Sequence, residues 1–181
     1  LSPIGAWAEQ QGATVITVPK LSFQDSIYTS NGIQEQVAMG VFMRMDIPQI
    51  IEQYSLYDDP NICQRHVLFT DADVVFPSPI SHDELNKLKY DMSSTGAILS
   101  YGREYHVAPT IINTGVMVMD VPRFAEEWPS ILRFGQSKNL SPLRNQPWLN
   151  SYFESTEVNK RKRALLPLHW NWKAYWRLEP S

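Results

Sequence analysis

The stretch His66-Val67-Leu68-Phe69-Thr70-Asp71-Ala72-Asp73-Val74-Val75-Phe76 decides which fold the sequence predicts. The apolar run at residues 67–69 is typical of a buried strand, and it passes into Asp71-Ala72-Asp73 before apolar residues resume. Side chains at positions i and i+2 of a strand point the same way. We therefore expect the carboxylates of Asp71 and Asp73 to converge at the end of this strand.

Two converging carboxylates favour a bound cation. Ionised groups are costly to desolvate unless an opposite charge neutralises them, and carboxylate oxygens suit hard ions such as Mg²⁺ or Mn²⁺. Open α/β sheets bind ligands beyond the carboxyl ends of their strands. Asp71 and Asp73 thus predict a metal-and-diphosphate site. The alternatives are a helix cap or turn, and the Asp-x-Asp-x-(Thr/Val) pattern of haloacid-dehalogenase-like phosphatases, in which the first Asp is a nucleophile.

Composition predicts one folded α/β domain over residues 1–181. The chain is 43% hydrophobic and 19% charged, with 16 basic and 19 acidic residues and a net charge of -3, which gives no reason to expect a nucleic-acid partner. The single cysteine excludes an internal disulfide framework. No apolar run approaches the roughly 18 residues that a membrane-spanning helix needs.

Hydrophobic periodicity predicts further elements on both sides of this stretch. In chain order they are a helix over residues 1–11, a strand over 15–18, a helix through residues 37–45, helical turns over 50–54, a helix over 83–90, strands over 96–101 and 110–121, helices over 122–135 and 148–153, and a strand over 164–167. Strand, helix and strand in this order predict a right-handed parallel crossover. Gly115 predicts a bulge or a close backbone approach to a ligand. Gly135 predicts the end of the helix before it. The basic run Lys160-Arg161-Lys162-Arg163 predicts a solvated loop.

Five segments, in this order, resemble the glycogenin-type retaining glycosyltransferases, glycosyltransferase family eight. They are residues 42–48, similar to the helix with an Arg before the Asp-x-Asp strand; 67–75, similar to that strand; 113–119, similar to the Asn-x-Gly-hydrophobic strand; 146–150, similar to the Gln-x-x-Leu-Asn step; and 166–171, similar to the Leu-Pro-x-x-(aromatic)-Asn segment. Five short motifs in the order of the family are fairly specific, and they span about positions 33 to 173.

The resemblance implies a glycosyltransferase-A type fold, an α/β fold with a mixed, mostly parallel sheet between helices. It implies transfer of a sugar from a UDP-sugar to a hydroxyl of an unknown carbohydrate, lipid or protein, with retention at the anomeric carbon. By the same resemblance Asp71 and Asp73 ligate Mn²⁺ or Mg²⁺, which stabilises the charge of the leaving UDP. The secretory lumen (Golgi) and the cytoplasm both remain open as the compartment.

The resemblance also implies which side chains bind the donor. The implied set is Arg44, Asp71, Ala72, Asp73, Asn113, Thr114, Gly115, Asn145 and Gln146. Gln146 would lie across the sugar from the leaving group, where an amide can stabilise an oxocarbenium-like centre but is a poor nucleophile. The structural alternatives are a solvated Arg44, a strand-capping Asn113 and a Gln146 that packs beside Trp148.

The chain departs from the family pattern at three places. Asn145 stands where the family often has Asp. The chain begins at what resembles the family's second helix and stops before its His-Phe-x-Gly-x-Lys-Pro segment. We therefore expect a domain that is incomplete at both ends, with the nucleotide loop and the third metal ligand outside it. His169, a lone histidine in an aromatic tail, is expected to be structural.

Three other functions compete with the retaining transferase. The phosphatase would need a late acidic pair, and the sequence has no late Asp-Asp pair. An inverting transferase would need a carboxylate base, for which Asp120 and Glu154 are the nominal candidates. A non-catalytic module that binds a nucleotide sugar is the third.

Overall fold

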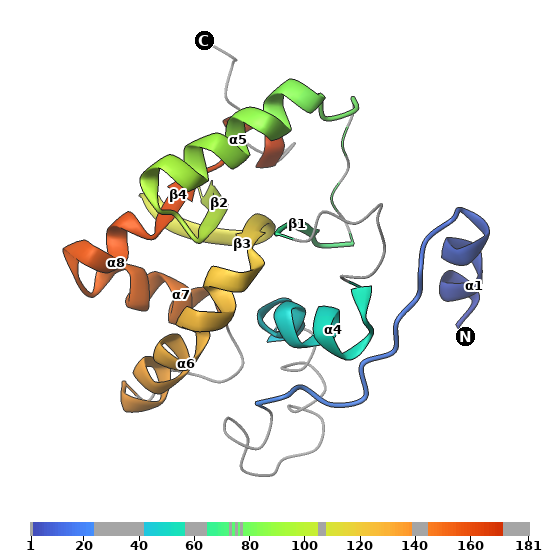
Figure 1. Cartoon of the computed structure of the whole chain (residues 1–181), viewed down its shortest axis with the longest axis horizontal. Coiled ribbons are helices and arrows are strands. Elements are labelled where there is room, and N and C mark those ends of the chain that lie inside the picture. Colours follow the sequence, from blue (N-terminus) through green and yellow to red (C-terminus); the bar gives the residue numbers. More distant parts are fainter. Residues whose placement is uncertain are drawn as a thin grey trace.

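The computed structural model describes residues 2–23, 42–56, 65–72, 74, 76, 78–104, 108–138 and 145–171 (Figure 1). Most of the helix expected through residues 37–45, and also Asp73, lie outside this part of the chain. In chain order the elements are α1 (Pro3–Gln10), the 3-10 helix η1 (Met43–Asp46), α4 (Ile47–Gln53), β1 (His66–Thr70), α5 (His82–Thr95), β2 (Leu99–Glu104), β3 (Ala108–Asp120), α6 (Val121–Ser137), α7 (Asn145–Glu154), α8 (Glu157–Arg161), β4 (Arg163–Leu165) and the 3-10 helix η3 (Leu168–Asn171).

The described strands form one mixed sheet in the order β1-β3-β2-β4, so the α/β class is confirmed. The β1–β3 and β2–β3 pairs are antiparallel, and β2–β4 is parallel. The expectation of mostly parallel pairing is therefore wrong for these four strands, because β3 returns between β1 and β2. Residues 15–18 form no strand and open no parallel crossover; instead the Thr17 carbonyl accepts a hydrogen bond of 2.8 Å from the Tyr54 hydroxyl.

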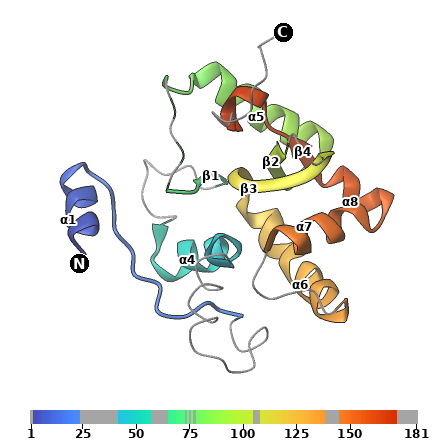
Figure 2. The ribbon, with the colours of Figure 1, turned by 180° about the vertical axis from the view of Figure 1, so that it is seen from behind.

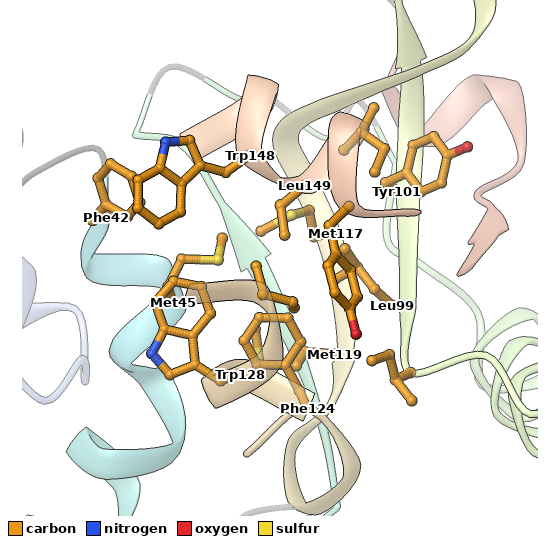
Figure 3. Close-up of a cluster of buried hydrophobic side chains, with 14 of the residues drawn as sticks. Phe42, Met45, Leu99, Tyr101, Met117, Met119, Phe124, Trp128, Trp148 and Leu149 are labelled. Atoms are coloured by element: carbon orange, nitrogen blue, oxygen red, sulfur yellow. The ribbon is translucent and has the colours of Figure 1, made fainter. Parts of the chain in front are cut away.

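Strand β3 is buried on both faces, which explains its continuous apolar run. Met117 and Met119 point into one core, and Val116 and Val118 into another. The first core is completed by side chains from α6 and α7 and by Met45 of η1 (Figure 3). The second lies under α5 and η3, on the other side of the sheet (Figures 1 and 2). Each large apolar side chain buried in this way stabilises the fold by roughly 1.5–3 kcal/mol.

Helix α6 begins as predicted and ends later than predicted. Pro122 lies in its first turn, and the Asp120 side chain caps it by accepting from the Arg123 amide at 3.5 Å. Gly135 does not end the helix, which continues to Ser137. A Cβ on Gly135 would lie 2.2 Å from Cε3 of Trp148, so this glycine instead lets α7 pack closely against α6.

The basic run after α7 spans the end of α8 and the start of β4 rather than a solvated loop. Residues Glu157–Arg161 form α8. Lys160 binds Glu157 at 2.7 Å, and Lys162 binds Glu127 of α6 at 2.7 Å. The Lys162–Glu127 ion pair thus holds this run against α6, whereas Arg161 is exposed. Within the described part of the chain, no helix combines the length and apolar character that crossing a membrane requires.

Candidate functional site

The site begins at a bulge in β3. Tyr101 of β2 pairs with Met117, but the next residue, Gly102, pairs with Asn113, so residues 114–116 face no partner in β2. On the opposite side, pairing with β1 continues to the end of that strand, and the Asp71 amide donates to the Gly115 carbonyl at 2.8 Å. The bulge predicted at Gly115 is confirmed. It places the end of β1 directly beside residues 113–115.

The Asn113 side chain is fixed at both ends of its amide. Its Oδ1 accepts from the Gly115 amide at 3.0 Å, and its Nδ2 donates to Glu104 Oε2 at 2.6 Å. Asn113 therefore stabilises the bulge, and Glu104 sets the orientation of the amide. Sequence reasoning missed Glu104. The available signal was an acidic residue at the end of β2, the strand that pairs with the Asn-containing strand.

Gly115 is where Asp71 and Asn113 approach each other. An ideal Cβ on this glycine would lie 3.1 Å from Asn113 Oδ1 and 3.2 Å from Asp71 Oδ2. Both distances are tighter than ordinary van der Waals contact, so a larger residue would push the two side chains away. The two oxygens border the same space, and the Asp71 side chain remains 39% exposed.

Arg44 reaches this site from η1. Its Nη2 lies 2.9 Å from Asp71 Oδ1, and its Nη1 donates to the Thr114 carbonyl. The guanidinium carbon lies 4.6 Å from the centre of the Phe69 ring, a cation–π arrangement. Only 9% of the side chain is exposed, so the alternative of a solvated Arg44 is wrong. Burial lowers the pKa of Arg44, against the opposing effect of the Asp71 charge, and the group stays protonated.

Gln146 is linked to the bulge indirectly. It lies in the first turn of α7, where its carbonyl accepts from Asn150 Nδ2 at 2.9 Å. Asn150 Oδ1 in turn accepts from the Ile112 amide at 2.7 Å, beside Asn113. Sequence reasoning did not assign this linking role to Asn150, although the residue is part of the quoted Gln-x-x-Leu-Asn step.

The remaining predicted donor-binding residues are only partly described. Ala72 is exposed after β1, and Asn145 begins α7 with its side chain outside the described atoms. Asp73, the second predicted metal ligand, also lies outside the described residues. The structure therefore brings together Arg44, Asp71 and residues 113–115, and leaves the Asp-x-Asp pair itself as a prediction.

The chemistry of the described donor atoms fits a hard divalent cation. Asp71 Oδ2 and Asn113 Oδ1 both border the space beside Gly115, and oxygen atoms are the ligands that Mg²⁺ and Mn²⁺ prefer. Within residues 65–72 and the other described ranges, no three His, Cys, Asp or Glu side chains gather into a metal cluster. Asp71 alone would be an incomplete site, so Asp73 or a bound diphosphate must supply further oxygens.

Three other candidates have structural partners away from Asp71. His169 Nε2 lies 2.8 Å from Glu84 Oε1, which joins η3 to α5 and agrees with its expected structural role. Asp120 is buried opposite His66, at the far end of β1, and accepts from Arg65 Nη2 at 2.9 Å. Glu154 forms an ion pair with Arg163. Asp120 and Glu154 are thus engaged in holding elements together.

Comparison of the chain with protein-family models, with curated proteins and with solved structures found no match. The geometry of the site and the motifs of the sequence are therefore the grounds for a function.

Proposed function

We propose that the chain is a glycosyltransferase of the glycogenin-type retaining family, with a glycosyltransferase-A type fold, that moves a sugar from a UDP-sugar to an acceptor hydroxyl. One observation carries the proposal. Arg44, Asp71 and residues 113–115 meet at the β3 bulge, although 27 residues separate Arg44 from Asp71 and 70 separate it from Thr114. The resemblance assigns all of these residues to the donor site, and their positions in the sequence do not force them to meet.

The proposed roles follow from the chemistry of each group. Asp71, together with Asp73, holds a Mn²⁺ or Mg²⁺ ion, which stabilises the negative charge that develops on the leaving diphosphate. Arg44 supplies a positive group with a planar fork of donors that suits phosphate oxygens. Asn113 presents an oriented amide to the donor sugar. Gly115 leaves the space that the ligand needs, because a side chain here would displace Asp71 and Asn113.

Retention is proposed because Asp120 and Glu154, the nominal bases for inversion, are occupied elsewhere in the fold. Gln146 is proposed to face the anomeric carbon. Its amide would stabilise positive charge there without forming a stable covalent intermediate.

The proposal is tested by titrating UDP with Mn²⁺ into the full-length protein in a calorimeter. Asp71→Asn should weaken binding by at least about tenfold, because it removes a metal-binding charge. Arg161→Gln, a charge change in the exposed last turn of α8, should leave the affinity unchanged and serves as the control. UDP binding that is absent, or indifferent to Asp71→Asn, would refute the donor site.

Turnover distinguishes the competing functions. Release of UDP from a panel of UDP-sugars is expected, with an anomeric configuration in the product, read by NMR, that matches the donor. The opposite configuration would indicate an inverting enzyme. UDP binding without turnover would indicate a non-catalytic module, and hydrolysis of an aryl phosphate would indicate the phosphatase.

A further inference from the structure

The Arg44 guanidinium is held firmly but is not fully satisfied. Its two terminal nitrogens bind Asp71 Oδ1 and the Thr114 carbonyl. Its Nε is buried and has no hydrogen-bond partner among the described residues. A buried donor without an acceptor costs free energy. An anion that accepted a hydrogen bond from Nε would remove this cost. The guanidinium carbon also lies 4.6 Å from the centre of the Phe69 ring.

Asp71 is bound on one side and open on the other. Oδ1 takes the Arg44 contact at 2.9 Å, whereas Oδ2 borders the space beside Gly115. The side chain is 39% exposed, against 9% for Arg44. A cation that arrives from solvent can therefore reach Asp71, but it meets the positive charge of Arg44 at the same carboxylate.

We infer that Arg44 is the internal counter-ion of Asp71 while no donor is bound, and that it competes with a divalent cation for this carboxylate. The inference rests on the proposed function. A guanidinium in contact with Asp71 repels a second positive charge there. A diphosphate offers the acceptor that Nε lacks and draws the guanidinium toward itself. Asp71 then becomes free to bind the cation, so cation and diphosphate bind in a coupled manner.

The test is a titration of Mn²⁺ into the full-length protein without nucleotide. The electron paramagnetic resonance signal of free Mn²⁺ measures how much of the ion stays unbound. Arg44→Gln should bind Mn²⁺ at least about tenfold more tightly than the wild type, because the competing charge is gone. The additional Asp71→Asn change should abolish this gain. Arg161→Gln makes the same change in net charge on α8 and should leave the affinity unaltered. Equal or weaker binding by Arg44→Gln, compared with Arg161→Gln, would overturn the inference.

A measurement on the wild-type protein covers the case in which Arg44→Gln does not fold. The Arg44 Nε–H resonance, assigned by its absence from the spectrum of Arg44→Lys, should shift when Mg²⁺ and UDP are added together. An unmoved resonance under saturating ligand would overturn the inference. Failure of this inference can be distinguished from failure of the proposed function. If only the inference fails, UDP with Mn²⁺ still binds in an Asp71-dependent way; if the function fails, that binding is absent.

Discussion

Arg44 and Asp71 form an ion pair whose partners differ in exposure, 9% against 39%. Removing the exposed partner leaves a buried guanidinium without a counter-charge, which is the costly way to break such a pair. We expect Asp71→Asn to lower the free energy of unfolding in urea by about 1–3 kcal/mol, less than for a fully buried pair because water screens Asp71.

The matched test of this prediction is the double variant Arg44→Met with Asp71→Asn. It removes both charges and keeps an apolar side chain over Phe69, so it should be more stable than the sum of the two single changes predicts. Strict additivity of the three unfolding free energies would show that the two side chains do not interact.

His66 makes stability depend on pH. Its side chain is 8% exposed, and its Nε2 lies 4.0 Å from Asp120 Oδ2. Burial lowers the pKa of His66 below its ordinary value of 6.5, and Arg65 and Lys89 act in the same direction, whereas Asp120 opposes them. The unfolded chain therefore takes up a proton at a pH where the folded chain does not. The contribution of His66 to stability is thus fully present above about pH 6.5, and it is lost as the pH falls through the lower pKa of the folded state.

The measurement is urea unfolding at several pH values below and above 6.5, the ordinary pKa of the group. His66→Gln should flatten the loss of stability below this value, and His82→Gln, at the exposed start of α5, should not. An unchanged pH profile in His66→Gln would assign the effect to other groups.

At the scale of elements, local patterns predicted most helices and strands because periodicity and caps act over a few residues. Helices α5 and α7 and strands β1 to β4 overlap the predicted ranges, although α5 continues to Thr95 and β2 begins three residues later than predicted. The predictions that failed concern features that depend on packing against other elements. Residues 15–18 are β-branched like a strand but have no strand to pair with in the described fold. Gly135 resembles a helix stop but makes room for Trp148.

The packing of α6 against α7 provides a prediction at this scale. Gly135→Ala puts a Cβ where Trp148 lies, at 2.2 Å from Cε3, and should lower the free energy of unfolding by about 1–3 kcal/mol despite the better helix propensity of alanine. Glu126→Ala, on the exposed face of α6, should change it by less than about 0.5 kcal/mol. Gly135→Ala should cost less stability in a Trp148→Leu background than in the wild type, and an equal cost in both backgrounds would show that the two side chains do not clash.

At the scale of the whole molecule, the site depends on contacts that sequence spacing cannot reveal. The motifs identified Arg44, Asp71 and Asn113, but not that Arg44 binds Asp71 directly, because this contact crosses 27 residues of chain. Nor could they show that β3 lies between β1 and β2. Such pairings are decided by which apolar faces can be buried together, and here both faces of β3 are covered.

The N-terminal segment, residues 2–23, is attached to this core mainly through its last three residues. The α1 helix lies to one side of the sheet in both views, with Ile4 and Trp7 exposed by 78% and 61% (Figures 1 and 2). Leu21 and Phe23 are buried in the core, at 1% and 5% exposure. Between them, the amide and hydroxyl of Ser22 donate to the two oxygens of Asp46, at 2.8 Å and 2.5 Å.

Asp46 therefore secures the segment to η1, the same helix that carries Arg44. Asp46→Ala leaves two polar groups of Ser22 without their acceptors, and we expect it to raise hydrogen exchange over residues 15–23 more than over β3. Mass spectrometry of peptides from the exchanged protein measures both regions at once. Glu52→Ala, an exposed acidic change on α4, is the control and should leave both unchanged. Because η1 positions Arg44 against Asp71, the same variant should also weaken binding of UDP with Mn²⁺. Unaltered exchange over residues 15–23 in Asp46→Ala would show that the contacts between Ser22 and Asp46 are not needed to hold the segment in place.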